Sequence, residues 1–120
     1  MYRFYNRNPK KIIEEDCVCR AISTALGIRY HAADRLLDLI SEQEGCDKLC
    51  VCCYHRLLED IFGLKVRYCY FEETVRDIAL DHPNEKVIIR VDGHLTCSVM
   101  GAVLDIWDCS DEPVDCFWIV

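Results

Sequence analysis

The spacing of apolar residues changes from a helical period to a strand period near Gly63, and this change limits what the chain can fold into. Before Gly63, apolar residues recur every three or four positions, which is typical of amphipathic helices. Three helices are expected there: 17–26, 30–44 and 52–62. After Gly63, apolar and polar residues alternate or form short apolar runs between turns, which predicts β-strands.

The second half is expected to form antiparallel strands, with one short helix over 72–80. The strands are expected at 65–70, 86–91, 95–99, 103–107 and 116–120. Helices followed by antiparallel strands indicate an α+β fold, with the N-terminal helices packed on one face of a C-terminal antiparallel sheet. A chain of 120 residues has room for one core, so residues 1–120 are expected to form a single domain.

Charge and hydropathy exclude several kinds of partner. The formal net charge is −7, and nucleic-acid affinity depends largely on basic residues, so no nucleic-acid partner is expected. The chain has no run of eighteen apolar residues and no signal-peptide core at Met1, so we expect no membrane association and a cytoplasmic location. In that compartment the ten cysteines are expected to be reduced.

The densest group of cysteines is an alternative candidate for a functional site. Cys46, Cys50, Cys52 and Cys53 lie close together with His55, and a metal could bind through them. Structural zinc sites usually have two paired Cys-x2-4-Cys knuckles, and this spacing lacks a second pair. We therefore expect no metal and no other cofactor, and we interpret most of these cysteines as small apolar residues.

Cys17 stands at the expected start of the first helix. Asp16 is a good N-cap residue and Gly27 a good stop signal, so Cys17 falls at the first helical position. The free N–H groups and the positive end of the helix dipole favour a thiolate there, and Arg20 adds a positive charge one turn later. This predicts a nucleophile, although a small cysteine at this place could equally belong to the core.

A cysteine nucleophile needs a base, and His94 is the best candidate of the four histidines. It follows Gly93 and opens a strand, whereas His31 and His55 are expected on solvated helix surfaces. An ordinary residue at the edge of a strand is the alternative for His94. The base in turn needs an orienting acid or amide, as in other nucleophilic sites.

Hairpin geometry points to Asp105 as that acid. If Met100 and Gly101 form a two-residue turn, Thr96 pairs with Asp105, and the carboxylate becomes a diagonal neighbour of His94. A one-residue bulge would bring Asp108 to this face instead, so Asp108 is the alternative third member. A solvent-facing strand position is the other interpretation of Asp105.

Three more residues have candidate roles. A tetrahedral intermediate needs donors for its oxyanion, and the Cys17 backbone N–H can supply one. Asn6 or Asn8, upstream of the helix, could supply the second, although asparagines beside Pro9 commonly form turns. On the predicted face of His94, Trp107 could shield the histidine from water, or it could simply be a large core side chain.

The order of these motifs resembles the papain-like cysteine peptidase superfamily in its broad sense. The matching residues are Asp16-Cys17-Val18-x-Arg20-Ala21-Ile22, Gly93-His94-Leu95-Thr96 and Asp105-Ile106-Trp107-Asp108-Cys109-Ser110. Among its members, the chain looks most like short peptidase-like proteins of phages and prophages, over nearly its whole length. The resemblance implies that Cys17 is the nucleophile, His94 the general base and acid, and Asp105 the orienting residue.

Two classes of function remain. The first is hydrolysis of an amide or peptide bond in a peptide or protein substrate through an acyl-enzyme, with an acyltransferase or deamidase using the same three residues. The second is a non-catalytic binding or inhibitor protein on the same fold, acting through its acidic surface.

Overall fold

Helix α1 (Cys17–Leu26) begins and ends where the sequence predicts. The computed structural model describes the whole chain, Met1 to Val120. Gly27 ends α1 with φ 67°, a left-handed conformation that glycine adopts without strain. Asp16 occupies the N-cap position, but its carboxylate makes no capping hydrogen bond. The reason for this departure lies in the site described below.

The other helices also lie in the expected stretches: α2 has the expected ends, and the later helices have shifted ends. α2 spans Tyr30–Glu44, and α3 (Val51–Arg56) continues into the π-helical turn η1 (Leu57–Ile61). α4 covers Val75–Asp81 and so begins three residues later than expected. Thr74 caps it: the side chains of Thr74 and Asp77 each accept a hydrogen bond from the other's backbone N–H, a reciprocal capping box that fixes the start of α4.

Six strands form one sheet in the order β1-β5-β4-β3-β6-β2. Their bounds are β1 Tyr2–Phe4, β2 Val66–Tyr68, β3 Lys86–Val91, β4 His94–Val99, β5 Ala102–Asp105 and β6 Val114–Ile119. The sheet is mixed rather than purely antiparallel, because β1 pairs in parallel with β5. The sequence analysis missed β1, since a three-residue strand is too short to show a period.

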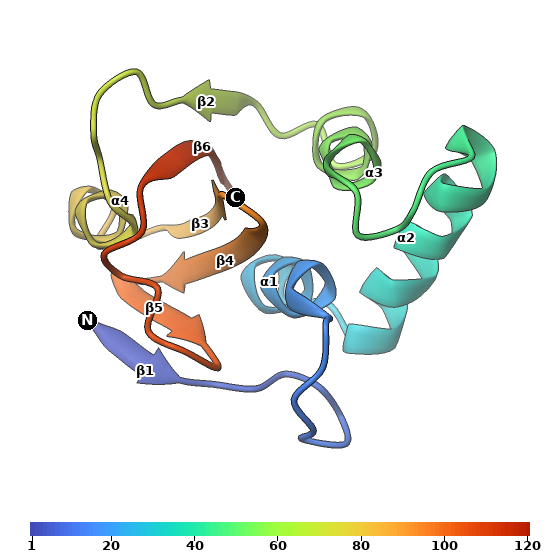
Figure 1. The fold of residues 1–120 in the computed structure, drawn as a ribbon, viewed down its shortest axis with the longest axis horizontal. Helices are drawn as coiled ribbons and strands as arrows, with labels where there is room; N and C mark the ends of the chain where they lie inside the picture. The colour runs from blue at the N-terminus through green and yellow to red at the C-terminus, as the bar shows by residue number, and fades with distance from the viewer.

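Helices cover both faces of the sheet, because α4 packs on the face opposite the N-terminal helices (Figure 1). On one face, α1, α2 and α3 pack against Ile88, Leu95 and Trp118. On the other face, α4 packs against Val87 and Ile89. Neighbouring residues of β3 thus enter different cores, as the two-residue period of a strand requires. The N-terminal helices do share one face, and the fold class is α+β as predicted.

The hairpin between β4 and β5 has the predicted two-residue turn. Val99 pairs with Ala102, and both turn residues, Met100 and Gly101, have positive φ (52° and 81°). Positive φ at both positions is the mark of a type I′ turn. Continuing this register places Thr96 opposite Asp105, so the end of β5 comes close to the start of β4. None of the helices has the length and hydropathy that a membrane span requires.

Candidate active site

Folding brings Cys17 and His94 to the same groove. The groove has a volume of about 380 Å³ and opens between the start of α1 and the start of β4. Cys17, His94 and Leu95 all line it, and the neighbouring His94 and Leu95 lower the pKa of the Cys17 thiol. Cys17 is partly exposed, so the sulfur is neither sealed in the core nor isolated from the histidine.

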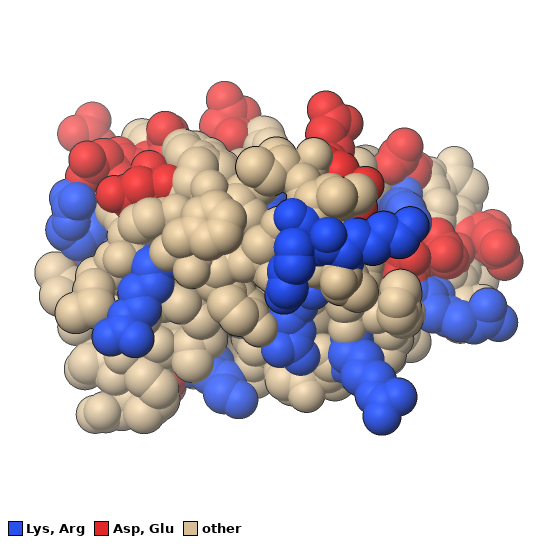
Figure 2. All heavy atoms as spheres, turned by 90° about the horizontal axis from the view of Figure 1, so that it is seen from below, with Lys and Arg blue, Asp and Glu red and all other residues tan.

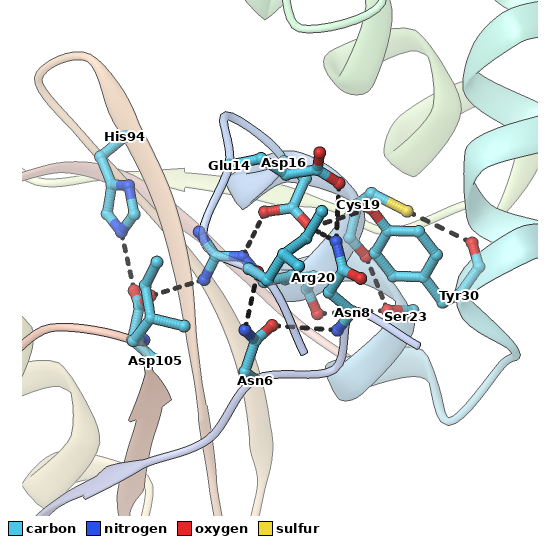
Figure 3. A network of polar contacts seen from close by, with 12 residues as sticks. Asn6, Asn8, Glu14, Asp16, Cys19, Arg20, Ser23, Tyr30, His94 and Asp105 are labelled. Atoms are coloured by element: carbon cyan, nitrogen blue, oxygen red, sulfur yellow. Dashed lines mark hydrogen bonds and ion pairs between the residues drawn. The ribbon is translucent and has the colours of Figure 1, made fainter. Parts of the chain in front are cut away.

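Asp105 completes a line of three groups. Its Oδ2 lies 2.7 Å from Nε2 of His94, and Nδ1 is therefore the ring nitrogen left for Cys17 (Figure 3). The carboxylate of Asp105 is buried, with 2% of its side chain exposed, and the imidazole has 11% exposed. The ring of Trp107 lies 5.0 Å from that of His94, centroid to centroid, and covers part of it.

Electrostatics favour a thiolate–imidazolium pair. Burial raises the pKa of the Cys17 thiol, but the hydrogen bonds with His94 and Leu95 and the charge of Arg20 outweigh it, so this pKa lies below its usual value. Burial lowers the pKa of His94, but Asp105 and the two nearby thiols raise it well above its usual value. Both shifts favour transfer of the proton from sulfur to imidazole.

The rest of the groove offers apolar walls and a polar floor. Val18, Leu49 and Val51 contribute apolar surface, and Leu49 and Val51 are themselves exposed. Arg90 lies deeper, and its Nη1 donates to Nε2 of His55 over 2.8 Å. His55 was expected to be solvated, but it packs against Trp118 and pairs with Glu59. The groove therefore combines apolar side chains with the charged groups of Arg90, Asp92 and Asp115.

Asp108, the alternative third member, does not contact His94. It is exposed, and its carboxylate accepts hydrogen bonds from the backbone N–H and the hydroxyl of Ser110. The predicted hairpin register places Asp105 beside the imidazole and leaves Asp108 in the following bend. Of the two carboxylates, only Asp105 is in a position to orient the histidine.

The two asparagines proposed as oxyanion donors are occupied elsewhere, which corrects that expectation. Asn6 donates to the backbone oxygen of Ile12, and Asn8 donates to Glu14 and Asp16. Both amides also accept backbone N–H groups, as in the turns that asparagine commonly forms. These side chains hold the loop that leads into α1, and no hydrogen bond joins either of them to Cys17.

The first turn of α1 keeps its backbone N–H groups free. The carboxylate of Asp16 turns away from them and accepts hydrogen bonds from Arg20 and Tyr30 instead. The N–H groups of Cys17, Val18 and Cys19 consequently have no acceptor within the protein. Free N–H groups at a helix start attract negative charge, so the Cys17 N–H remains an oxyanion donor.

Sequence analysis did not identify Cys109 as part of the site. This cysteine is fully buried, and its thiol lies 3.6 Å from Oδ2 of Asp105, the oxygen that His94 also uses. Cys109 belongs to one of the motifs of the family resemblance, but its position after Asp108 falls outside the hairpin register on which the other assignments rest, so the sequence assigned it no role.

One group of three side chains has the proximity that a metal site needs. Ligand atoms of His94, Asp105 and Cys109 lie within 4.8 Å of one another. Arg20 already donates to the same carboxylate over 2.8 Å, so a positive charge is in place without an ion. In the other candidate group, the sulfurs of Cys50 and Cys52 lie 3.3 Å apart, but Cys53 faces the backbone oxygen of Leu37 and His55 is held by Glu59 and Arg90.

Surface charge is uneven despite the net charge of −7. Figure 2 views the side on which β1 and the loop before α1 lie, and it shows lysine and arginine across the middle with acidic residues mainly along the edges. Residues 1–11 contain Arg3, Arg7, Lys10 and Lys11 and no acidic residue. The surface is therefore not uniformly acidic, which weakens the basis of the binding-protein alternative.

No protein-family model, curated protein or solved structure matches the chain.

Proposed function

We propose that the protein is a cysteine-dependent hydrolase of amide or peptide bonds that works through an acyl-enzyme. The observation that carries the proposal is the position of His94, which hydrogen-bonds Asp105 through Nε2 and lines the same open groove as Cys17, whose pKa it lowers. A nucleophile, a base and an orienting acid in series are the parts that nucleophilic catalysis needs.

The first half of the reaction forms the acyl-enzyme. The Cys17 thiolate attacks the carbonyl carbon, a C–S bond forms, and the carbonyl electron pair moves to oxygen. The Cys17 backbone N–H donates to this oxyanion. The intermediate then collapses, the C–N bond breaks, and Nδ1 of His94 gives its proton to the departing amine.

The second half releases the acid. Neutral His94 takes a proton from water, and the resulting hydroxide attacks the thioester carbon. The C–S bond breaks and the electron pair returns to sulfur as thiolate. Throughout, the Asp105 carboxylate holds Nε2–H, which keeps Nδ1 directed at the sulfur.

An ester that acylates thiols tests the proposal directly. We expect p-nitrophenyl acetate to leave an acetyl thioester on Cys17, detectable by mass spectrometry, and to be turned over in repeated cycles. Cys17→Ser should lose both signals. Exposed Cys50 serves as a reference within the same digest, since it also has a thiol whose pKa is lowered, through hydrogen bonds from the Cys52 backbone and thiol. Acetylation of Cys50 in preference to Cys17 would contradict the proposal.

A further inference from the structure

Arg20 is a buried arginine that joins two carboxylates from distant parts of the chain. It is 6% exposed, its Nε lies 2.6 Å from Oδ1 of Asp16, and its Nη1 lies 2.8 Å from Oδ1 of Asp105. Figure 3 shows the guanidinium between them. A charge buried this deeply is costly unless it is paired, and here both acidic partners are buried as well.

The contacts of Asp105 are divided between its two oxygens. Oδ1 accepts from Arg20 and from the backbone N–H of Ile106, over 2.8 and 2.7 Å. Oδ2 accepts from Nε2 of His94 over 2.7 Å. Two firm donors on Oδ1 fix the rotation of the carboxyl group, so Oδ2 is the oxygen that remains for the histidine.

The other end of the link is fixed at the start of α1. Oδ2 of Asp16 accepts from the hydroxyl of Tyr30 over 2.8 Å and from the amide of Asn8 over 3.0 Å. Asp16 directly precedes Cys17, and its i, i+4 spacing to Arg20 brings the two side chains together on one helix turn. The nucleophile is thereby tied through Asp16 and Arg20 to the carboxylate that holds its base.

We propose that Arg20 is a positioning residue: it fixes the start of α1 to the end of β5 and turns Asp105 so that one oxygen faces His94. This inference rests on the proposed function. Arginine suits the task because its planar guanidinium presents N–H groups in two fixed directions, one for each carboxylate. A lysine ammonium keeps the charge but not these fixed directions.

Two substitutions separate charge from position. Arg20→Met removes the charge. Arg20→Lys keeps the charge but loses the two fixed N–H directions of the guanidinium. The first readout is the rate of Cys17 alkylation by iodoacetamide between pH 5 and 9, and the second is the NMR signal of the proton between His94 and Asp105. A rise of one unit in the thiol pKa lowers the rate at pH 6 about tenfold, and we expect at least this from Arg20→Met. Arg20→Lys should give a smaller loss and a shifted proton signal.

Tyr30→Phe is the matched control. It removes one of the two hydrogen bonds to Oδ2 of Asp16, while Asn8 still holds that oxygen and Arg20 still joins Asp16 to Asp105. We therefore expect a lower unfolding midpoint with an unchanged alkylation profile. Wild-type rates and a wild-type proton signal in Arg20→Lys would overturn the positioning role and leave only a charge effect. If Arg20→Met does not fold, the comparison of Arg20→Lys with Tyr30→Phe still tests whether Arg20 positions Asp105.

Failure of the inference can be told apart from failure of the proposed function. If Cys17 of the unsubstituted protein reacts no faster than Cys50, the proposed function fails, and the role of Arg20 fails with it. If Cys17 reacts fast and Arg20→Lys behaves as the unsubstituted protein, only the inference about Arg20 is overturned.

Discussion

Two histidines of this protein each hydrogen-bond a carboxylate, yet their surroundings shift their pKa values in opposite directions. His94 is 2.7 Å from Asp105 and His55 is 3.0 Å from Glu59. The second nitrogen of His94 faces a thiol that can give up a proton. The second nitrogen of His55 instead accepts a hydrogen bond from Arg90, and an acceptor nitrogen carries no proton.

The comparison shows that a carboxylate alone does not make a histidine a base. Burial and the charge of Arg90 lower the pKa of His55 although Glu59 opposes them. For His94, the hydrogen bonds of Asp105 and the two thiols overcome burial and raise the pKa. The group on the far nitrogen therefore separates a structural histidine from a candidate catalytic one.

The largest expected effect comes from removing each histidine in turn. We expect His94→Ala to slow alkylation of Cys17 at pH 6.5 by about 10²-fold, because the thiol loses both its hydrogen bond and its cationic neighbour. His55→Ala should leave the Cys17 rate unchanged and lower only the thermal stability. Peptide mapping after brief iodoacetamide treatment measures both rates, with Cys50 as the reference. An equal loss of the Cys17 alkylation rate in both variants would contradict a specific role of His94.

A smaller effect is expected from the carboxylates near His94. Asp105→Ala leaves Arg20 and His94 without their buried partner, so we expect slower turnover of p-nitrophenyl acetate and a loss of about 3 kcal/mol in the free energy of unfolding. Asp108→Ala breaks only exposed contacts with Ser110, so the rate of ester turnover and the free energy of unfolding should stay unchanged. Ester turnover and urea unfolding test the pair. A larger loss in Asp108→Ala than in Asp105→Ala would indicate that Asp108, not Asp105, orients His94.

The smallest effect is in the pH dependence of stability, measured in Cys17→Ala so that the thiol does not titrate. The raised pKa of His94 means that its contribution is complete below the unfolded value near 6.5 and is lost as the pH rises above it, by up to about 1.4 kcal/mol per pH unit. For His55 the lowered pKa gives the opposite sign, with a contribution lost as the pH falls below 6.5. Urea unfolding measures the free energy of unfolding against pH in this background. His94→Gln should flatten this curve above pH 6.5, and His55→Gln should flatten it below pH 6.5.

Much of the fold follows from local signals in the sequence. Gly27 and Gly45 end α1 and α2 in the left-handed conformation, and the apolar run of β3 gives its bounds, Lys86–Val91, without error. The hairpin register also followed from Met100-Gly101 and placed Asp105 near His94. In each case neighbours in sequence determine the structure, so periodicity and turn chemistry suffice.

What the sequence did not reveal depends on distant contacts. Asp16 has the residue type and position of an N-cap, but its carboxylate accepts hydrogen bonds from Arg20 and Tyr30 instead of from the backbone N–H groups of α1. Asn8 likewise donates its hydrogen bonds to Glu14 and Asp16 in the loop before α1 and not into the groove. His55 was misplaced because its burial depends on Trp118, more than sixty residues later in the chain. Side-chain partners of this kind are fixed only by the tertiary packing.

Strand β1 has a consequence for the order in which the protein folds. Phe4 pairs with Asp105, and the backbone N–H of Tyr5 donates to the Asp105 oxygen over 2.9 Å, across about a hundred residues of chain. Contacts of such high sequence separation close late, since the loop entropy is lost before they form. During synthesis β1 cannot pair until β5 has been made, so Asp105 and the loop that leads to Cys17 come together only after both segments have left the ribosome.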